Sequence, residues 1–306
     1  MNLFLECVLF VAGLVFGSFL NVCISRVPRD ESIVNPPSHC RRCGKPVRWR
    51  DNIPLLSFTL LHGRCRDCDA RISWRYPAVE LLTGLVFVGC YVWFGPSWTT
   101  LKFCVFAFLL LGLIFMDAET GLLPHEFTYT GIALGLAFAW IAPGDFAGTQ
   151  LILRAFHQQI ENPRALSLLD AVIGAAVGAG FFYIAWALYY LVRKRHGLGF
   201  GDIALMAMTG AFLGLKLNLF VIACAPVMTL VCVLAMQGSQ AVRHRSGENW
   251  RGVESGEPEL RSANSSAADE PPFLEREIPF GVFLGACSLL AIFFGEAAWT
   301  WYLGRF

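Results

Sequence analysis

The chain has 306 residues, of which 56% are hydrophobic and only 15% are charged, and its formal net charge is +1. Ordinary globular chains have about 45–50% apolar and about 25% charged residues, so this composition excludes most classes of soluble protein. A nearly neutral chain also gives no reason to expect a nucleic-acid partner.

The apolar residues occur in long runs, and a helix that crosses a bilayer needs about 20 such residues. These runs predict an all-α polytopic membrane protein with about eight transmembrane helices. The first run leads into Asn21, Arg26 and Arg29 without a small-residue cleavage site, which favours a permanent helix over a removed signal peptide. In chain order the runs lie at residues 3–25, 77–95, 99–116, 128–142, 169–192, 203–216, 218–237 and 278–303.

The distribution of basic residues predicts the orientation of these helices. Residues 26–75 contain eleven Lys and Arg against five Asp and Glu, whereas residues 95–100 contain neither. Positively charged loops stay in the cytoplasm, so residues 26–75 are expected inside the cell. The basic charge is then explained by topology and by contact with anionic membrane lipid. Lys102, Asp170 and Glu296 are expected at outer helix ends, at a solvated interface.

Five segments are predicted from this pattern. A polar stretch near the end of the chain is rich in Ser and Glu, so it cannot bury a core and is expected to be flexible. The segments are a first transmembrane helix (1–25), a cytoplasmic four-cysteine zinc-binding domain (26–75), a transmembrane catalytic core (76–237), the polar cytoplasmic loop (238–277) and a last transmembrane helix (278–306).

Four of the eleven cysteines form two CxxC pairs separated by 21 residues. Each pair presents two thiolates from one tight turn, and two such turns complete the tetrahedral Cys₄ site typical of structural Zn²⁺. The alternative is a pair of disulfides or redox-active motifs, but a cytoplasmic location disfavours stable disulfides. The sequence therefore predicts structural zinc on Cys40, Cys43, Cys65 and Cys68, with Gly44 and Gly63 providing open backbone at the turns.

Two carboxylates, Asp117 and Asp202, are predicted at the cytoplasmic ends of their helices, with 84 residues between them. Carboxylates are costly at membrane depth, so each is a candidate functional group. Brought together, they would share a proton, so that one activates water while the other polarises a carbonyl. Glycines at 197, 199 and 201 suit an irregular turn before Asp202.

Each aspartate also has a purely structural interpretation. Asp202 could cap a helix that begins at Ile203, since Asp is a preferred N-cap residue. Asp117 could be an interfacial residue before a turn at Gly121 and Pro124. Considered singly, each structural interpretation is the better supported one, and the catalytic hypothesis rests on the coincidence of the two positions.

Several motifs resemble those of bacterial prepilin peptidases, in the same order along the chain. GLVFGSFLNVCISRVPR resembles the first helix and its exit in that family, and the segment from Cys40 through RISWRYPAVELLTG resembles the zinc-binding loop and second helix. MDAETGLLP and GFGD are similar to the two aspartate motifs of these GxGD proteases, and IPFGVFLGA resembles the final helix. The match covers most of the chain.

The resemblance implies that Asp117 and Asp202 are the catalytic pair of a membrane aspartic endopeptidase. Its substrates would be the leaders of type IV prepilins or type II secretion pseudopilins, cut at the cytoplasmic face of the bacterial inner membrane. Substrate helices and membrane lipid are the implied partners. The resemblance also implies N-methylation of the new terminus with S-adenosylmethionine, for which the sequence assigns no residues.

The chain departs from the family pattern in two places. His125 follows the Leu-Pro where many members have Asp, which favours Asp117 over that position, and Glu119 is a weaker substitute two residues away. The long polar loop is the second departure. Two alternatives stay open: a GxGD protease with another class of substrate, and a non-enzymatic membrane scaffold or transporter with a zinc-bound docking loop.

Overall fold

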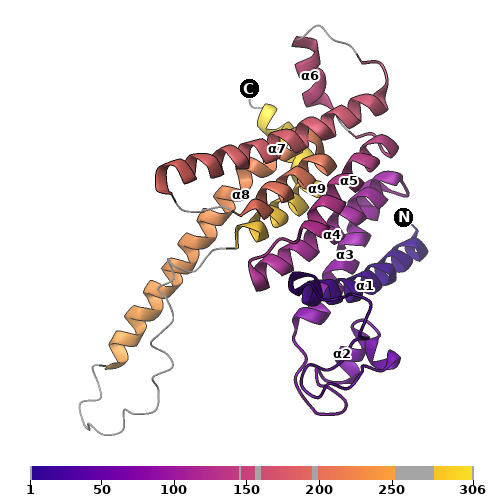
Figure 1. Cartoon of the computed structure of the whole chain (residues 1–306), viewed down its shortest axis with the longest axis vertical. Coiled ribbons are helices and arrows are strands. Elements are labelled where there is room, and N and C mark those ends of the chain that lie inside the picture. The colour runs from indigo at the N-terminus through magenta and orange to yellow at the C-terminus, as the bar shows by residue number, and fades with distance from the viewer. Residues whose placement is uncertain (1, 145, 156–159, 195–198, 252–278, 305–306) are drawn as a thin grey trace.

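The structure is a computed structural model that describes residues 2–144, 146–155, 160–194, 199–251 and 279–304 (Figure 1). These residues are mainly helical, with two short 3₁₀ turns at Val27–Arg29 and Trp49–Asn52. The helices are α1 (Leu3–Arg26), α2 (Leu56–Leu60), α3 (Arg75–Phe94), α4 (Trp98–Thr120), α5 (His125–Ile141), α6 (Ala147–Ala155), α7 (Pro163–Arg193), α8 (Phe200–Arg251) and α9 (Phe280–Leu303).

The prediction of an all-helical, multi-pass membrane protein is confirmed. Within the described residues, six helices are long and apolar enough to cross a membrane: α1, α3, α4, α7, α8 and α9. The predicted run 128–142 corresponds to α5, which is shorter at 17 residues. The runs 203–216 and 218–237 both lie in α8, so the number of crossings depends on the path of this helix.

Helix α8 reverses direction at Gly214, whose φ of 76° and ψ of −177° are essentially restricted to glycine. A straight helix would hold Met206 and Asn218 about 18 Å apart. Instead, the Met206 carbonyl and the Asn218 side chain both contact Gly178 of α7. The two apolar runs therefore form a hairpin beside α7, which accounts for two of the predicted crossings within a single long element.

The side chains that face outward from the helices are apolar, as contact with lipid requires. Large side chains along α1 and α7, among them Phe4, Val15, Ile184 and Leu191, are more than half exposed. The interior is formed mainly by α4, α8 and α9, and the Phe106 ring stacks on that of Phe212 with centroids 4.5 Å apart. In water such exposed apolar surface would be unfavourable, so it supports placement of the bundle in a bilayer.

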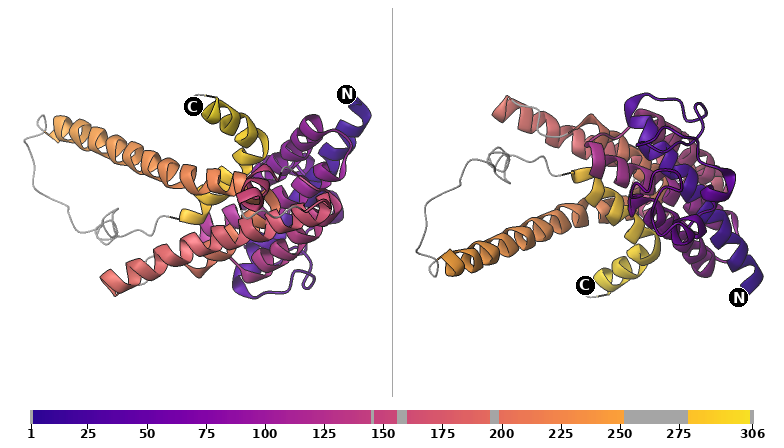
Figure 2. Two further views of the ribbon diagram at one scale, coloured as in Figure 1. Left: turned by 90° about the horizontal axis from the view of Figure 1, so that it is seen from above. Right: turned by 90° about the horizontal axis from the view of Figure 1, so that it is seen from below.

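The polar loop predicted over residues 238–277 differs from the structure in its first part. Helix α8 continues to Arg251, so residues 238–251 are helical, and this part of α8 projects away from the bundle (Figure 2). Helix propagation adds one hydrogen bond for each further residue, so a helix can extend into a polar sequence. The remainder of the predicted loop, 252–277, lies outside the described residues.

Residues 27–74 form a small module at one end of α1 and α3 (Figure 1). Arg75 joins this end of the bundle together, because its guanidinium pairs with Glu119 of α4 and donates to the Ser25 hydroxyl of α1 at 3.0 Å. Glu80 of α3 accepts a hydrogen bond of 2.9 Å from the Leu55 backbone N–H in the module. The module is thus anchored to α3, whose end is in turn joined to α1 and α4.

Candidate active site and metal centre

Asp117 lies in the last turns of α4 and is only 6% exposed. The helix ends at Thr120 because Gly121 adopts φ 65° and its N–H bonds back to the Asp117 carbonyl at 2.8 Å. Pro124 follows and is the N-cap residue of α5. The side chain reaches the start of α9, where its Oδ2 accepts a hydrogen bond of 2.9 Å from the Val282 N–H.

Asp202 lies in the first turn of α8 and is 8% exposed. The helix begins at Phe200, so the alternative in which Asp202 is the N-cap of a helix starting at Ile203 is wrong. Its own N–H bonds to the Gly199 carbonyl at 3.2 Å, which fixes the turn immediately before it. Gly197, the first of the three predicted turn glycines, lies outside the described residues.

Leu123 brings the two carboxylates into one site. A Cβ atom on Gly201, next to Asp202, would lie 2.6 Å from the Leu123 Cβ. A Cβ atom on Gly281 would lie 3.0 Å from the Leu123 Cδ1 and 2.8 Å from the Asp117 Oδ2. The ends of α4, α8 and α9 thus meet around one leucine side chain, and the two carboxylates repel each other electrostatically.

Two other residues considered from the sequence lie outside this site. Glu119 is exposed and pairs with Arg75, so it is engaged at the surface of the bundle. His125 is also exposed, and its ring stacks on Tyr129 with centroids 5.1 Å apart. Of the acidic residues in the segment 117–126, only Asp117 is buried.

Such a pair has the chemistry of a general acid and a general base. Two carboxylates in one buried, low-dielectric site cannot both be ionised easily, so such a pair can share one proton. The ionised member can take a proton from water, and the protonated member can donate to a carbonyl oxygen. The Val282 N–H helps to hold Asp117 in a fixed orientation.

The four predicted cysteines form a cluster that can hold a metal ion, with their sulfur atoms all within 4.8 Å of one another. Cys40 Sγ and Cys68 Sγ are 3.7 Å apart. A tetrahedral site with Zn–S bonds of about 2.3 Å separates its sulfurs by about 3.8 Å, whereas a disulfide requires about 2.05 Å. The four thiols are free, and this donor set fits a four-coordinate thiolate site.

The two CxxC turns have the same backbone design. In each turn the residue four positions after the first cysteine has a positive φ, 72° at Gly44 and 55° at Asp69. Gly63, which the sequence suggested for the second turn, also has a positive φ of 67° but lies two residues before Cys65. Asp69 was missed because Asp is less distinctive than Gly at such positions, although it tolerates them.

Backbone N–H groups favour the thiolate form in the first turn. The N–H groups of Cys43 and Arg42 lower the pKa of Cys40 to about 6. Thiolates, not thiols, bind metal, so this turn presents a ready ligand at neutral pH.

The structure also adds residues that the sequence did not single out for the carboxylate site. Gly281 and Val282 lie beside the Asp117 side chain and Leu123 lies beside Gly281, and each belongs to a motif that the sequence did highlight, LLP or IPFGV. The proline and glycine of IPFGV were the available signal, because proline is typical of a helix start and glycine permits close approach of a neighbouring segment. Their partner could not be read from the sequence, since 164 residues lie between Asp117 and Val282.

Comparisons with known proteins agree with this arrangement. Residues 11–94 match the bacterial peptidase A24 N-terminal domain, and residues 104–234 match the type IV leader peptidase family. The chain belongs to the bacterial prepilin leader peptidase family. The two matched regions contain both CxxC pairs and both aspartates.

Individual relatives carry the same description, prepilin leader peptidase/N-methyltransferase. The protein of Aeromonas hydrophila is 32% identical over 97% of this chain and 93% of its own length. That of Neisseria gonorrhoeae is 35% identical over 74% of this chain and 80% of its own length. That of Myxococcus xanthus is 44% identical, but the match spans only 67% of this chain and 55% of the relative. A comparison with solved structures gives no match.

Proposed function

We propose that this prepilin peptidase uses Asp117 and Asp202 as its catalytic pair and removes the leaders of type IV prepilins or type II secretion pseudopilins. The observation that carries the proposal is the pair of buried carboxylates around Leu123, at one end of a bundle of membrane helices. The same end holds the basic module of residues 27–74. Because basic segments stay inside, this end faces the cytoplasm of the bacterial inner membrane.

The chemistry follows from the shared proton. The ionised carboxylate takes a proton from water, whose oxygen attacks the scissile carbonyl while the other carboxyl group donates its proton to the carbonyl oxygen. Collapse of the tetrahedral intermediate breaks the C–N bond, and the departing amine receives a proton from the pair. The apolar helix of the substrate lies in the bilayer, with its basic leader in the cytoplasm.

The test is cleavage of a pilin-like leader by the purified protein in detergent, with Asp117→Asn and Asp202→Asn as variants. Each change keeps the shape of the side chain and removes its acid. Both variants are expected to lose cleavage by roughly 10³-fold, as removal of a general acid or base does. Glu119→Gln is the matched control, because Glu119 is exposed, two residues from Asp117 and paired with Arg75.

The outcome decides between three interpretations. Loss of cleavage in both Asn variants, with helical content and bound metal retained, supports the paired-aspartate peptidase. Full activity in either variant removes that carboxylate from the mechanism. A wild-type protein that leaves pilin-like leaders intact but cuts another membrane substrate would instead support the alternative of a GxGD protease with a different substrate class.

For the metal centre, the donor set supports Zn²⁺ on Cys40, Cys43, Cys65 and Cys68 in a structural role. Four thiolates leave no open coordination position for catalysis. The metal would join the two turns of the module, whose other cross-links are exposed ion pairs such as Arg66 with Asp51. Metal analysis of the purified protein should give one zinc per chain.

The N-methyltransferase activity named in the relatives requires a methyl donor, and a cavity of about 610 Å³ offers room for S-adenosylmethionine. It lies between the module and the ends of α1 and α3. Asn21, only 2% exposed, lines it, and its Oδ1 has no hydrogen-bond partner among the described residues. Glu80 lines it too and provides a buried carboxylate suited to a cationic donor.

The bound donor would supply its methyl group to the new amino terminus of the cut substrate. Asn21→Leu and Glu80→Gln are expected to weaken S-adenosylmethionine binding by at least tenfold, measured by equilibrium dialysis of the purified protein. Leader cleavage should persist in both variants, because neither residue contacts the carboxylate pair. Unchanged binding in both would exclude this cavity as the donor site.

A further inference from the structure

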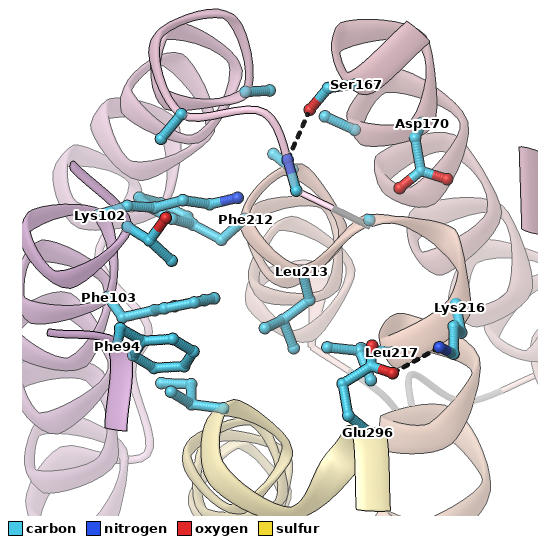
Figure 3. Close-up of a pocket in the computed structure, with 18 residues that line it drawn as sticks. Phe94, Lys102, Phe103, Ser167, Asp170, Phe212, Leu213, Lys216, Leu217 and Glu296 are labelled. Carbon is cyan, nitrogen blue, oxygen red and sulfur yellow. Dashed lines mark hydrogen bonds and ion pairs between the residues drawn. The ribbon is translucent and has the colours of Figure 1, made fainter. Parts of the chain in front are cut away.

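At the end of the bundle opposite the carboxylate pair, six helices enclose a second cavity of about 230 Å³ (Figure 3). Its walls come from the end of α3, the start of α4, the end of α5, the first turns of α7, the turn within α8 and the second half of α9. Four charged side chains line it: Lys102, Asp170, Lys216 and Glu296. The sequence placed three of them at a solvated interface, but Lys102 and Asp170 are only 6% and 5% exposed.

The Asp170 carboxylate already accepts hydrogen bonds that stabilise the fold. Its Oδ1 accepts a hydrogen bond of 2.6 Å from the Thr149 hydroxyl, and its Oδ2 accepts one of 3.3 Å from the Leu215 N–H. Leu215 immediately follows Gly214, where α8 reverses. Asp170 thus satisfies backbone that the break in α8 leaves unpaired, as irregular backbone at membrane depth requires.

Lys102 has no comparable partner. Its side chain extends from α4 into the space between the helices (Figure 3), and its ammonium lies 5.5 Å from the centroid of the Phe103 ring. It donates no hydrogen bond to any residue that the structure describes. The ammonium of Lys102 loses hydration on burial, and both oxygens of Asp170 already accept hydrogen bonds from other groups. The ammonium therefore needs another oxygen acceptor in the cavity.

The lining residues that the structure describes carry no net charge. Lys216 and Glu296 form an ion pair at the rim, so two lysines face two carboxylates. A ligand with a single negative charge would give the occupied cavity a net negative charge, whereas a zwitterionic ligand would leave it neutral. The cavity also lies beside the last turn of α3 and the first turns of α4, toward the end of the bundle where lipid headgroups would lie, and the apolar rings of Phe94, Phe103 and Phe212 line it.

We propose that this cavity binds the headgroup of a zwitterionic phospholipid, with the phosphate accepting from Lys102 and the ammonium directed to Glu296 at the rim. Phosphatidylethanolamine has this chemistry. Its acyl chains would follow the apolar outer faces of the helices. The bound lipid would hold together six helices, including the turn of α8, at the side of the membrane away from the active site.

The test uses the full-length protein purified in detergent, with phosphatidylethanolamine, phosphatidylglycerol and soluble phosphoethanolamine as probes. Native mass spectrometry is expected to detect one retained phosphatidylethanolamine, and this lipid should raise the thermal unfolding midpoint more than the other two probes. Lys102→Met, which keeps the length of the side chain and removes its charge, should reduce retention at least tenfold. Lys194→Met is the matched control, because Lys194 is exposed at the opposite end of the bundle.

Each other outcome overturns a stated part of the proposal. Undiminished retention in Lys102→Met removes the lysine from the site. Equal retention of phosphatidylglycerol contradicts a zwitterionic headgroup, and equal stabilisation by phosphoethanolamine contradicts a lipid ligand. If Lys102→Met does not fold, photo-crosslinking of wild-type protein to a headgroup-labelled phosphatidylethanolamine decides: the label should fall on residues 94–103 or 211–217, and labelling elsewhere contradicts the site.

Discussion

The carboxylate pair and the cysteine cluster lie at the same end of the molecule but are built in opposite ways. The cysteines come from two tight turns within 29 consecutive residues, 40–68, and each turn is closed by its own backbone hydrogen bonds. The carboxylates come from different helices and depend on a third helix, α9, whose Val282 N–H holds Asp117. One site is therefore local in sequence, whereas the other depends on helix packing across the bundle.

This difference teaches where each site is vulnerable. A local site fails when one of its ligands or its turn geometry is lost, but its surroundings matter little. A site assembled by packing fails when any contacting helix shifts, even if both functional residues are intact. The following predictions test this contrast, in order of decreasing effect on leader cleavage.

The largest effect is expected for the double variant Asp117→Asn/Asp202→Asn. Groups that act as a unit show strongly non-additive losses, so the double variant should lose roughly 10³-fold of cleavage activity, no more than either single variant. Single-turnover assays of the three variants measure this. If the losses multiply instead, the two carboxylates act independently and the shared-proton mechanism is wrong.

The second prediction concerns packing alone. A Cβ atom on Gly281 would lie 2.8 Å from the Asp117 Oδ2, so Gly281→Ala must displace the carboxylate or the start of α9. Misplacement of a catalytic group by about 1 Å costs about 100-fold, and cleavage should fall by that factor.

Gly180→Ala is the control for this change, because a Cβ atom there meets nothing within 4 Å. It should leave the cleavage rate unchanged. Wild-type rates in Gly281→Ala would show that the site tolerates movement of α9, contrary to the assembly described here.

The third prediction concerns loss of the metal. Removal of zinc by a chelator, or the change Cys40→Ser, should unfold the module, because structural zinc sites of this type contribute about 10–16 kcal/mol of folding free energy. Limited proteolysis should then cut between residues 30 and 74, where the metal-loaded protein resists. Leader cleavage should fall by less than about tenfold, since the bundle can keep its structure when a local unit opens.

A loss of cleavage as large as that of the Asn variants would contradict this separation of the two sites. The circular dichroism signal of the helices provides the check that the bundle remains folded after zinc removal.

The smallest effect is expected for the turn positions. A Cβ atom on Gly44 meets nothing within 4 Å, so Gly44→Ala has only the backbone cost of a φ of 72°, about 1–2 kcal/mol. Zinc affinity, measured by competition with a chelator of known affinity, should fall by roughly tenfold. Asp69→Gly at the equivalent position should raise it slightly, and neither change should alter cleavage. Opposite signs would contradict the equivalence of the two turns.

Much of this protein was determined by the sequence alone. The apolar runs predicted the helices, since about 20 apolar residues in succession have no other stable arrangement across a bilayer. The two CxxC pairs predicted the cysteine cluster, because their spacing fixes four sulfurs within short turns. The positions of Asp117 and Asp202 at the ends of their helices were also expected, although their joint role remains a prediction until the variants are measured.

Only the tertiary structure decided the features that depend on contacts between distant segments. The reversal of α8 at Gly214 is stabilised by Asp170 of α7. The two apolar runs in the sequence, 203–216 and 218–237, instead placed the boundary between two helices a few residues later. The same packing buries Lys102, which the sequence placed at a solvated interface. The approach of α9 to Asp117 likewise spans most of the chain. Local propensity and hydropathy act over a few turns of helix, so they predict which segments are helices but not which side chains those helices bring together.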